Sequence, residues 1–220
     1  DSVARSQRYV SNTMARKGKK ARIPAPGEGK EAAKQVELPF ALEMKRPAKS
    51  RVELQLAGKT AVQVYDGKNG WLLRPYLNRD DWVPFSPEQA KSQQGKWDLD
   101  GPLFDHAAKG TKVKLASVEP VEGRDACKLE LTHKNGEVRH VWIDAKTFLD
   151  VKVEGTPQQM AGKMRTVWVT QRDFRSGQGL KVPFVLETAV DGYPDTHKII
   201  IEKVALNPRL DDARFVRPRA

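Results

Sequence analysis

Side chains that commonly perform catalysis or bind metal ions are few and scattered in this sequence. A single cysteine, Cys127, excludes an internal disulfide, a CxxC redox pair and a multi-cysteine zinc site. It alternates with leucines, so we expect it to be a small buried hydrophobic residue. The four histidines share no metal-ligand spacing with one another or with the cysteine: His106, His133, His140 and His197.

Two pairs of carboxylates, Asp80-Asp81 and Asp211-Asp212, are adjacent in the sequence. Neighbouring residues on a strand point to opposite faces, which is a poor arrangement for a cooperating acid and base. We expect each pair to cap a turn. The sequence also lacks a GxSxG elbow, an HExxH pair, a P-loop and a dinucleotide-binding glycine motif. We therefore expect no catalytic residue, no metal site and no cofactor, and we do not expect an enzyme.

One basic residue occupies an unusual position. Residues 36–46 read VELPFALEMKR, in which every second residue from position 36 to position 44 is apolar, and Arg46 has the same parity. On a regular strand its guanidinium would point to the apolar face, where its donors need partners. From the strand end it would reach the mouth of a cavity and bind carbonyl groups or a carboxylate such as Asp105. Alternatively, the strand ends at Lys45 and Arg46 lies in solvent.

Alternation of apolar and polar residues dominates the rest of the chain. This pattern is typical of antiparallel strands with one solvated face. Turn-forming breaks at 66–70, 134–137 and 177–179 separate the strands, so we predict a long meander. Beyond 36–46 and a first strand at 8–14, the expected strands are 51–56, 60–65, 112–118, 127–132, 138–143, 149–154, 165–171, 182–188 and 198–204.

Helices are scarce. Ser86 followed by Pro87 predicts the start of a short helix that ends at Gly95, and a second is expected over 102–108. Both lie in an insertion over residues 76–110, which is long for a meander and is expected to act as a lid. Residues 17–34, rich in Lys, Gly, Ala and Pro, are expected to form a mobile basic hairpin loop.

Composition limits the class of protein. The 220 residues carry a net charge of +11 and show no composition boundary, so we predict one domain over residues 1–220. No apolar stretch is long enough to span a membrane. Basic residues are spread along the chain with one dense run at 16–20, so nucleic-acid binding is not favoured. A sheet of ten or eleven strands with two short helices would either enclose a hydrophobic cavity or pack into a filled barrel.

Several motifs together resemble the LolA- and LolB-like family of periplasmic outer-membrane lipoprotein-sorting proteins. They are MKRPAKSRVEL, VYDGKNGWLLRP, GRDACKLELTHKNGEVRHVWIDAKTFLDVKVE, GLKVPFVLET and IEKVALNPRLDDARF, covering most of the chain from Val36 to Pro218. The similarity is closer to the widespread relatives of the carrier than to the carrier itself.

The resemblance implies a mainly β fold: an incomplete antiparallel β-barrel of about eleven strands, curled around a hydrophobic cavity and closed by a helical lid. It also implies that Arg46 holds the lid shut and that Gly67 shapes the turn before Trp71. The expected cavity lining is Leu38, Phe40, Leu42, Met44, Val52, Leu54, Leu56 and Trp71.

The function implied is that of a non-enzymatic carrier, which binds lipoprotein acyl chains or another envelope lipid for transfer toward the outer membrane. A monomer in the periplasm is expected, with its signal peptide removed and with an inner-membrane transporter and an outer-membrane acceptor as partners. The alternative is a basic module that binds polyanions, such as acidic glycolipid headgroups or nucleic acid, without a lipid cavity.

Overall fold

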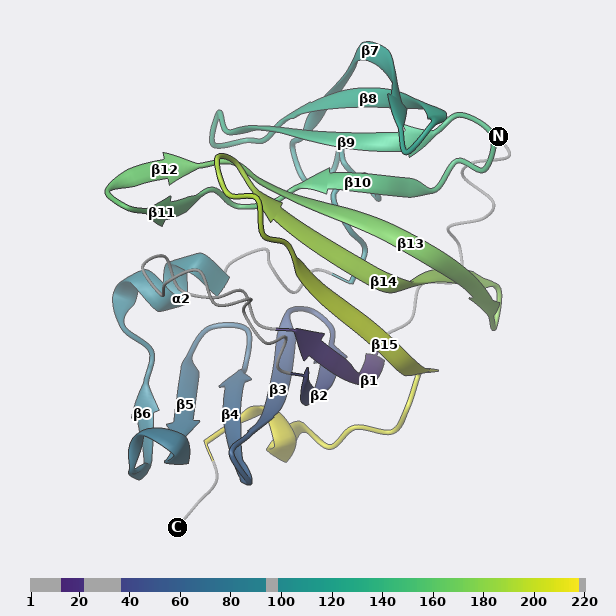
Figure 1. The fold of residues 1–220 in the computed structure, drawn as a ribbon. Coiled ribbons are helices and arrows are strands. Elements are labelled where there is room, and N and C mark those ends of the chain that lie inside the picture. Colours follow the sequence, from purple (N-terminus) through teal and green to yellow (C-terminus); the bar gives the residue numbers. More distant parts are fainter. Residues whose placement is uncertain (1–12, 22–36, 94–98, 218–220) are drawn as a thin grey trace. The chain divides into compact units, whose positions relative to one another are not determined.

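The computed structural model describes residues 13–21, 37–93 and 99–217, which form two compact units (Figure 1). Within these described residues, one unit comprises 13–21, 37–93, 99–101 and 200–217, and the other comprises 102–199. We call them the β1–β6 unit and the β7–β14 unit.

The β1–β6 unit is an antiparallel meander in which each strand pairs with the next one along the chain. A 3-10 turn, η1 (Pro75–Leu77), follows β5, and the short helix α2 (Pro87–Gln93) follows β6. The strands are β1 (Thr13–Ala21), β2 (Glu37–Lys45), β3 (Lys49–Leu56), β4 (Lys59–Tyr65), β5 (Gly70–Arg74) and β6 (Arg79–Pro84).

The β7–β14 unit is also antiparallel, with β13 paired to β10 and a small separate hairpin, β11–β12, between them in sequence. Its strands are β7 (Lys112–Val121), β8 (Arg124–Thr132), β9 (Val138–Asp144), β10 (Asp150–Glu154), β11 (Gln158–Met160), β12 (Lys163–Arg165), β13 (Val167–Gly177) and β14 (Leu180–Val190).

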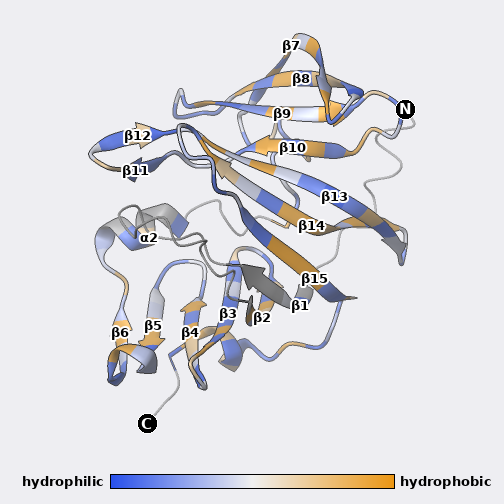
Figure 2. Cartoon of the chain, in the orientation of Figure 1, coloured by the Kyte–Doolittle hydropathy of each residue, from blue (hydrophilic) through white to orange (hydrophobic). Residues whose placement is uncertain are grey.

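The last strand, β15 (His197–Leu206), contributes residues to both units. Within the described residues, the hydrogen-bonded order is β6-β5-β4-β3-β2-β1 in one unit and β14-β13-β10-β9-β8-β7 in the other. The prediction of a mainly β, antiparallel fold of the incomplete-barrel class is confirmed, with fifteen strands among the described residues instead of about eleven. Apolar and polar residues alternate along the strands (Figure 2).

The basic run at 16–20 is not part of a loop. Residues 17–21 belong to β1, which pairs with β2 so that Arg16 lies opposite Leu42 and Gly18 opposite Phe40. The prediction of a hairpin loop over 17–34 is therefore wrong for its first residues, because cross-strand pairing outweighs the polar composition. The remainder of that segment, and most of the expected strand at 8–14, lie outside the described residues.

The first expected helix is confirmed as α2, which begins with a capping box. The Ser86 hydroxyl accepts a hydrogen bond from the backbone N–H of Gln89 (3.2 Å), and the Gln89 side chain accepts one from the backbone N–H of Ser86 (2.9 Å). Among the described residues, no helix is long and apolar enough to cross a membrane.

The prediction of a second helix over 102–108 is wrong. Residues 99–110 form consecutive turns, in which the N–H of Lys109 donates to the carbonyl of Asp105 and the N–H of Thr111 donates to that of His106. Asp105 has a φ of 48°, in the left-handed region, which interrupts a right-handed helix. The insertion also contains strand β6, so it is less helical than predicted.

The C-terminal segment covers one face of the β1–β6 sheet. Phe215, which is 0% exposed, ends the 3-10 turn η2 (Asp212–Phe215) and packs with Val62 and Val64 of β4. Partly buried side chains complete this cluster: Trp71, Leu73, Trp82 and Leu210. We call this side of the sheet the Val64 face.

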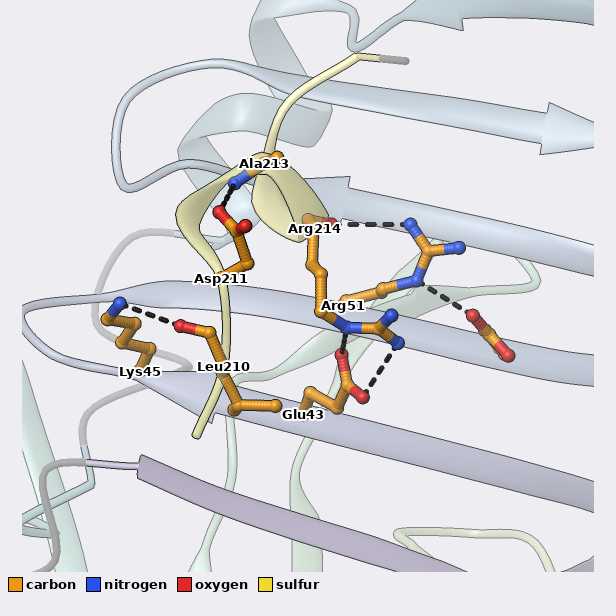
Figure 3. Close-up of polar contacts among 8 residues, drawn as sticks. Glu43, Lys45, Arg51, Leu210, Asp211, Ala213 and Arg214 are labelled. Atoms are coloured by element: carbon orange, nitrogen blue, oxygen red, sulfur yellow. Dashed lines mark hydrogen bonds and ion pairs between the residues drawn. The ribbon is translucent and has the colours of Figure 1, made fainter. Parts of the chain in front are cut away.

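Polar contacts along the neighbouring strands hold the C-terminal segment in place (Figure 3). Arg214 binds the carboxylate of Glu43 through two nitrogens, at 2.7 and 2.8 Å, and Lys45 donates to the carbonyl of Leu210 at 2.9 Å. Asp211 caps η2 by accepting from the N–H of Ala213. The expectation that Asp211 caps a turn is thus confirmed.

The core of the β7–β14 unit is built around Trp142, which packs with Val121, Ala126 and Val151. Its indole N–H donates to Glu119, and this hydrogen bond is the main cause of the lowered pKa of that carboxyl. The ammonium group of Lys152 lies 4.6 Å from the centre of the Trp142 ring.

Replacing Phe215 by Ala should destabilise the protein by about 3–5 kcal/mol, because the C-terminal segment loses its buried anchor. Denaturant unfolding measures the change. Val216→Ala is the matched control: Val216 is 41% exposed, and its truncation should change stability by less than about 0.5 kcal/mol. Equal effects of the two substitutions would contradict the anchoring role of Phe215.

Candidate functional site

The face of the β1–β6 sheet opposite the Val64 face is apolar. Directly paired residues of antiparallel strands point to the same face of a sheet, so the strand register shows which residues belong to this face. One cross-strand row joins Leu42, Val52, Gln63, Leu72 and Val83. We call this side of the sheet the Leu42 face.

Most of the expected cavity residues share this face. The register pairs Phe40 with Leu54, Leu42 with Val52 and Met44 with Ser50, while Leu38 and Leu56 follow in the same alternation. Whether these residues line a ligand cavity remains a prediction.

Trp71 does not share this face. It pairs directly with Val64 and packs against the cluster that contains Phe215, so it belongs to the Val64 face. Its expected place beside the other cavity residues is wrong because the β4–β5 turn sets its parity opposite to theirs. In that turn Gly67 has a φ of 102°, which confirms its expected turn role.

Burial varies along the Leu42 face. At one end Met44, Ser50 and Tyr65 are 7%, 0% and 3% exposed, and Phe85 stacks on Tyr65 with ring centres 6.3 Å apart. Phe85 also lies directly over Gly70, where a Cβ would come within 1.9 Å of the phenyl ring. The middle and the far end of the face are only half-buried. The packed end therefore gives way to a loosely filled apolar surface.

Hollows occur where the packing is loose. One of about 600 Å³ lies at the far end and is lined by Leu38 and Leu56 together with the β3–β4 turn residues Ala57 and Gly58. A second, of about 260 Å³, lies on β5 and β6 beside the start of α2, with Leu72, Val83 and Phe85 in its wall. The second hollow lies on the Leu42 face, whereas Pro39, Gln55 and Thr60 of the opposite face share the wall of the first.

Arg46 binds the insertion, as expected, but through a different carboxylate. Its two terminal nitrogens donate to the two oxygens of Asp100 in a planar, two-pronged pair. The side chain of Asp100 is 11% exposed and that of Arg46 is 30% exposed. The expected partner Asp105 is exposed. Arg46 thus does not point into bulk solvent.

The position of this pair differs from the expected cavity mouth. Arg46 directly follows β2 beyond Met44, at the packed end of the Leu42 face. Leu38, which lines the larger hollow, lies eight residues earlier, roughly 26 Å along an extended strand. The ion pair therefore closes the packed end, and the larger hollow is at the other end of β2.

Helix α2 contacts the same face. The side-chain amide of Gln63, in the middle of β4, donates to the side-chain oxygen of Gln93 at the end of the helix, at 3.2 Å. Gln93 is 8% exposed, so the end of α2 packs onto the sheet. The insertion thus meets the Leu42 face at Gln63 as well as at Arg46.

Sequence analysis missed two charged residues of this site. Arg16 lies opposite Leu42, which places a guanidinium on the apolar face, and burial lowers the pKa of Arg16. The run 16–20 reads RKGKK and shows no alternation of apolar and polar residues, so nothing in the sequence indicated that Arg16 belongs to a strand. Asp100 gave no local signal, because its partner is distant in the sequence.

The histidine, cysteine and aspartate residues considered above as possible catalytic or metal-binding groups do not come together in one site. Among the described residues, no group of three or more His, Cys, Asp or Glu is placed to hold a metal ion. His140 pairs with Glu154, and Asp212 with Lys45 and Lys49. Cys127 is half-buried, so it is less buried than expected.

Comparison with solved structures identifies the fold. A domain assigned to outer membrane lipoprotein sorting from Vibrio parahaemolyticus aligns with a TM-score of 0.62 and 13% identity over 97% of this chain and 94% of its own. A DUF1329 family protein from Desulfovibrio piger gives 0.65 and 15% over 97% and 93%. A LolA superfamily protein from Nitrosomonas europaea gives 0.65 and 15% over 98% and 96%.

No protein-family model and no curated protein sequence matches the chain. At these identities the structural likeness establishes the fold, which is that of LolA-superfamily structures. The resemblance seen in the sequence motifs is confirmed at this level.

The Arg46–Asp100 pair should show energetic coupling in a double-mutant cycle of Arg46→Leu and Asp100→Asn. We expect about 1–2 kcal/mol, because the pair is partly desolvated and makes two charge-assisted hydrogen bonds. Denaturant unfolding of the four proteins measures the coupling. The exposed pair Arg175–Asp173 is the matched control and should give less than about 1 kcal/mol. Additive effects at Arg46 and Asp100 would show that the contact does not join the strand to the insertion.

Proposed function

We propose that this chain is a non-enzymatic periplasmic carrier, which binds lipoprotein acyl chains or another envelope lipid on the Leu42 face for transfer toward the outer membrane. The observation that carries the proposal is that the two faces of the β1–β6 sheet differ in how far they are covered. The Val64 face is covered by Phe215 and its partners, whereas the Leu42 face keeps half-buried apolar side chains and a hollow walled by Leu72 and Val83.

Acyl chains suit such a surface on energetic grounds. Each buried methylene contributes about 0.8 kcal/mol, so ten would contribute about 8 kcal/mol before the cost of ordering the chain. Leucine and valine side chains supply this contact without demanding a fixed ligand orientation. A polar metabolite would need several convergent hydrogen-bond donors and acceptors, whereas the polar members of this row are Arg16 and Gln63, and Gln63 already bonds Gln93.

In this proposal the insertion acts as a lid and Arg46 holds it. The guanidinium of Arg46 binds Asp100 with two parallel hydrogen bonds, a geometry that lysine cannot reproduce. Breaking the pair would remove this link between Asp100 and the end of β2, while the Gln63–Gln93 contact remains. Entry and release of the ligand would then depend on this pair.

The likeness to lipoprotein-sorting structures supports the proposed location, oligomeric state and partners. A carrier between two membranes works in the periplasm as a monomer, receives its cargo from an inner-membrane transporter and delivers it to an outer-membrane acceptor. The alternative, a basic module for polyanions centred on 17–34, loses support because 17–21 form part of a paired strand.

Protein purified from a bacterial envelope should contain bound lipid, detectable by native mass spectrometry and by organic extraction. The delipidated protein should take up a fluorescent fatty acyl probe in a saturable manner. Absence of both lipid and saturable uptake would count against the carrier function. Tight, salt-sensitive binding of DNA without probe uptake would favour the polyanion alternative.

Truncation of the proposed binding wall should cost little stability. Leu54→Ala should lose less than the roughly 2–5 kcal/mol typical of packed sites, because Leu54 faces a loosely filled region. Leu131→Ala is the matched control, since Leu131 is 0% exposed, and should lose stability within that range. Similar large losses at Leu42, Leu54 and Leu131 would show a solid interior with no room for an acyl chain.

Arg46→Leu should impair transfer without preventing binding. The substitution removes the hold on the insertion and adds an apolar side chain that packs against acyl chains, so bound probe should pass more slowly to acceptor vesicles. Arg46→Lys should show a weaker form of the same defect. Lys68→Leu, which removes an exposed charge at the β4–β5 turn, is the control and should transfer normally. Normal transfer by Arg46→Leu would remove the gating role.

A further inference from the structure

A cluster of basic residues lies at one end of the β7–β14 unit, where the turns at 105–111 meet the β8–β9 hairpin loop. Lys112 begins β7 opposite Thr132, and the hairpin loop that follows β8 carries Lys134. Lys112 and Lys134 are both exposed. Lys109, also exposed, adds a third ammonium group in the adjoining turn.

Contacts between the two loops hold these lysines in one place. A Cβ on Gly110 would lie 3.3 Å from the Cβ of Lys134, so the stem of Lys134 packs directly over the turn that precedes Lys112. Gly110 has a φ of 73°, a conformation that favours glycine.

A buried threonine joins the same two loops. Thr111, which is 5% exposed, accepts a hydrogen bond at its carbonyl from Nδ1 of His106 (3.1 Å). Its hydroxyl lies 3.3 Å from Nδ1 of His133 in the hairpin loop. The two imidazoles therefore flank the turn between the lysines. The cluster is an ordered arrangement of loops and not a chance grouping on a mobile segment.

The charge at this end is positive. Over 105–112 and 132–139 there are four permanent cations and two carboxylates, an excess of two positive charges before the histidines are counted. Of the two carboxylates, Glu137 is paired with Arg139. The charged residues are Lys109, Lys112, Lys134, Arg139, Asp105 and Glu137.

An exposed apolar side chain lies beside the lysines. Val138 pairs with Thr132, which pairs with Lys112, so all three share a face, and Val138 is 44% exposed. Basic side chains next to an exposed aliphatic residue are the combination that favours the surface of an anionic bilayer.

We propose that Lys112, Lys134 and Val138 form a docking site for the surface of an anionic phospholipid bilayer. The lysines approach the lipid phosphates, and Val138 enters the boundary between headgroups and acyl chains. This site lies in the β7–β14 unit and does not depend on a ligand on the Leu42 face. Nucleic acid fits less well, because the cluster contains no Phe, Tyr or Trp on which bases would stack.

Binding to vesicles of equal parts phosphatidylglycerol and phosphatidylcholine, measured by cosedimentation, tests the proposal. The double variant Lys112→Gln/Lys134→Gln should bind roughly 25-fold more weakly, about fivefold for each lysine. The matched control Lys163→Gln/Lys181→Gln removes two exposed lysines of the same unit and should lose less than threefold or so. All four lysines are exposed, so both variants should melt like the wild type.

Val138→Ser should weaken vesicle binding severalfold without changing its dependence on salt, because no charge is lost. Equal losses for the two lysine pairs would overturn the proposal, since they would indicate attraction by net charge alone. Displacement from vesicles by millimolar inorganic phosphate would overturn it in favour of a phosphate site, and tighter binding to a DNA duplex in favour of nucleic acid. Acyl-probe uptake should be unchanged in Lys112→Gln/Lys134→Gln, which separates this proposal from the carrier function.

Discussion

Packing of Phe215 against Val62 and Val64 is the constraint on which the arrangement of the β1–β6 unit depends. A sheet has two faces, and each apolar face must be covered or remain available for a partner. The C-terminal segment satisfies one face with a fully buried aromatic ring and with polar contacts from Glu43 and Lys45 along its edge. Among the described residues of this unit, the short helix α2 and Asp100 contact the opposite face. The middle and the far end of that face remain half-buried.

The polar contacts of this unit connect segments that are distant in sequence. Arg46 joins the end of β2 to Asp100, and Arg214 joins the C-terminal segment to Glu43. Partly desolvated ion pairs of this kind contribute modestly to net stability, because the attraction between the charges is offset by their lost hydration. Their two-pronged geometry instead specifies where each segment lies. That property is consistent with the lid role that we propose for the insertion.

Several positive charges of the described residues are engaged by other parts of the fold. On β1, Arg16 is directed to the Leu42 face, opposite Leu42 itself. In the β7–β14 unit, Lys152 lies over the ring of Trp142, and Arg172 is held by Glu122 and Glu187. Positive charges with few carboxylates nearby remain at particular ends of the sheet, such as the one that carries Lys112 and Lys134.

Much of the fold could be predicted from the sequence, because strand periodicity and turn chemistry are local. Alternation at 36–46 identified β2, and Ser86-Pro87 identified the start of α2. The parity that placed Arg46 among apolar residues also indicated that it needed a partner. Local signals failed where a competing local conformation intervened, as at Asp105, whose left-handed backbone prevents the expected helix.

The identity of the partners was decided only by the tertiary structure. Asp100 carries no signal that distinguishes it from Asp105 until the turns at 99–110 bring it to Arg46. Trp71 is a large apolar residue of the kind that lines a cavity, but the β4–β5 turn directs it toward Val64 and Phe215. By itself, the sequence determined which residues alternate, where the chain turns and which charge needed a partner. Which face is covered depends on contacts between residues more than 100 positions apart, such as Glu43 and Arg214, and periodicity carries no information about such contacts.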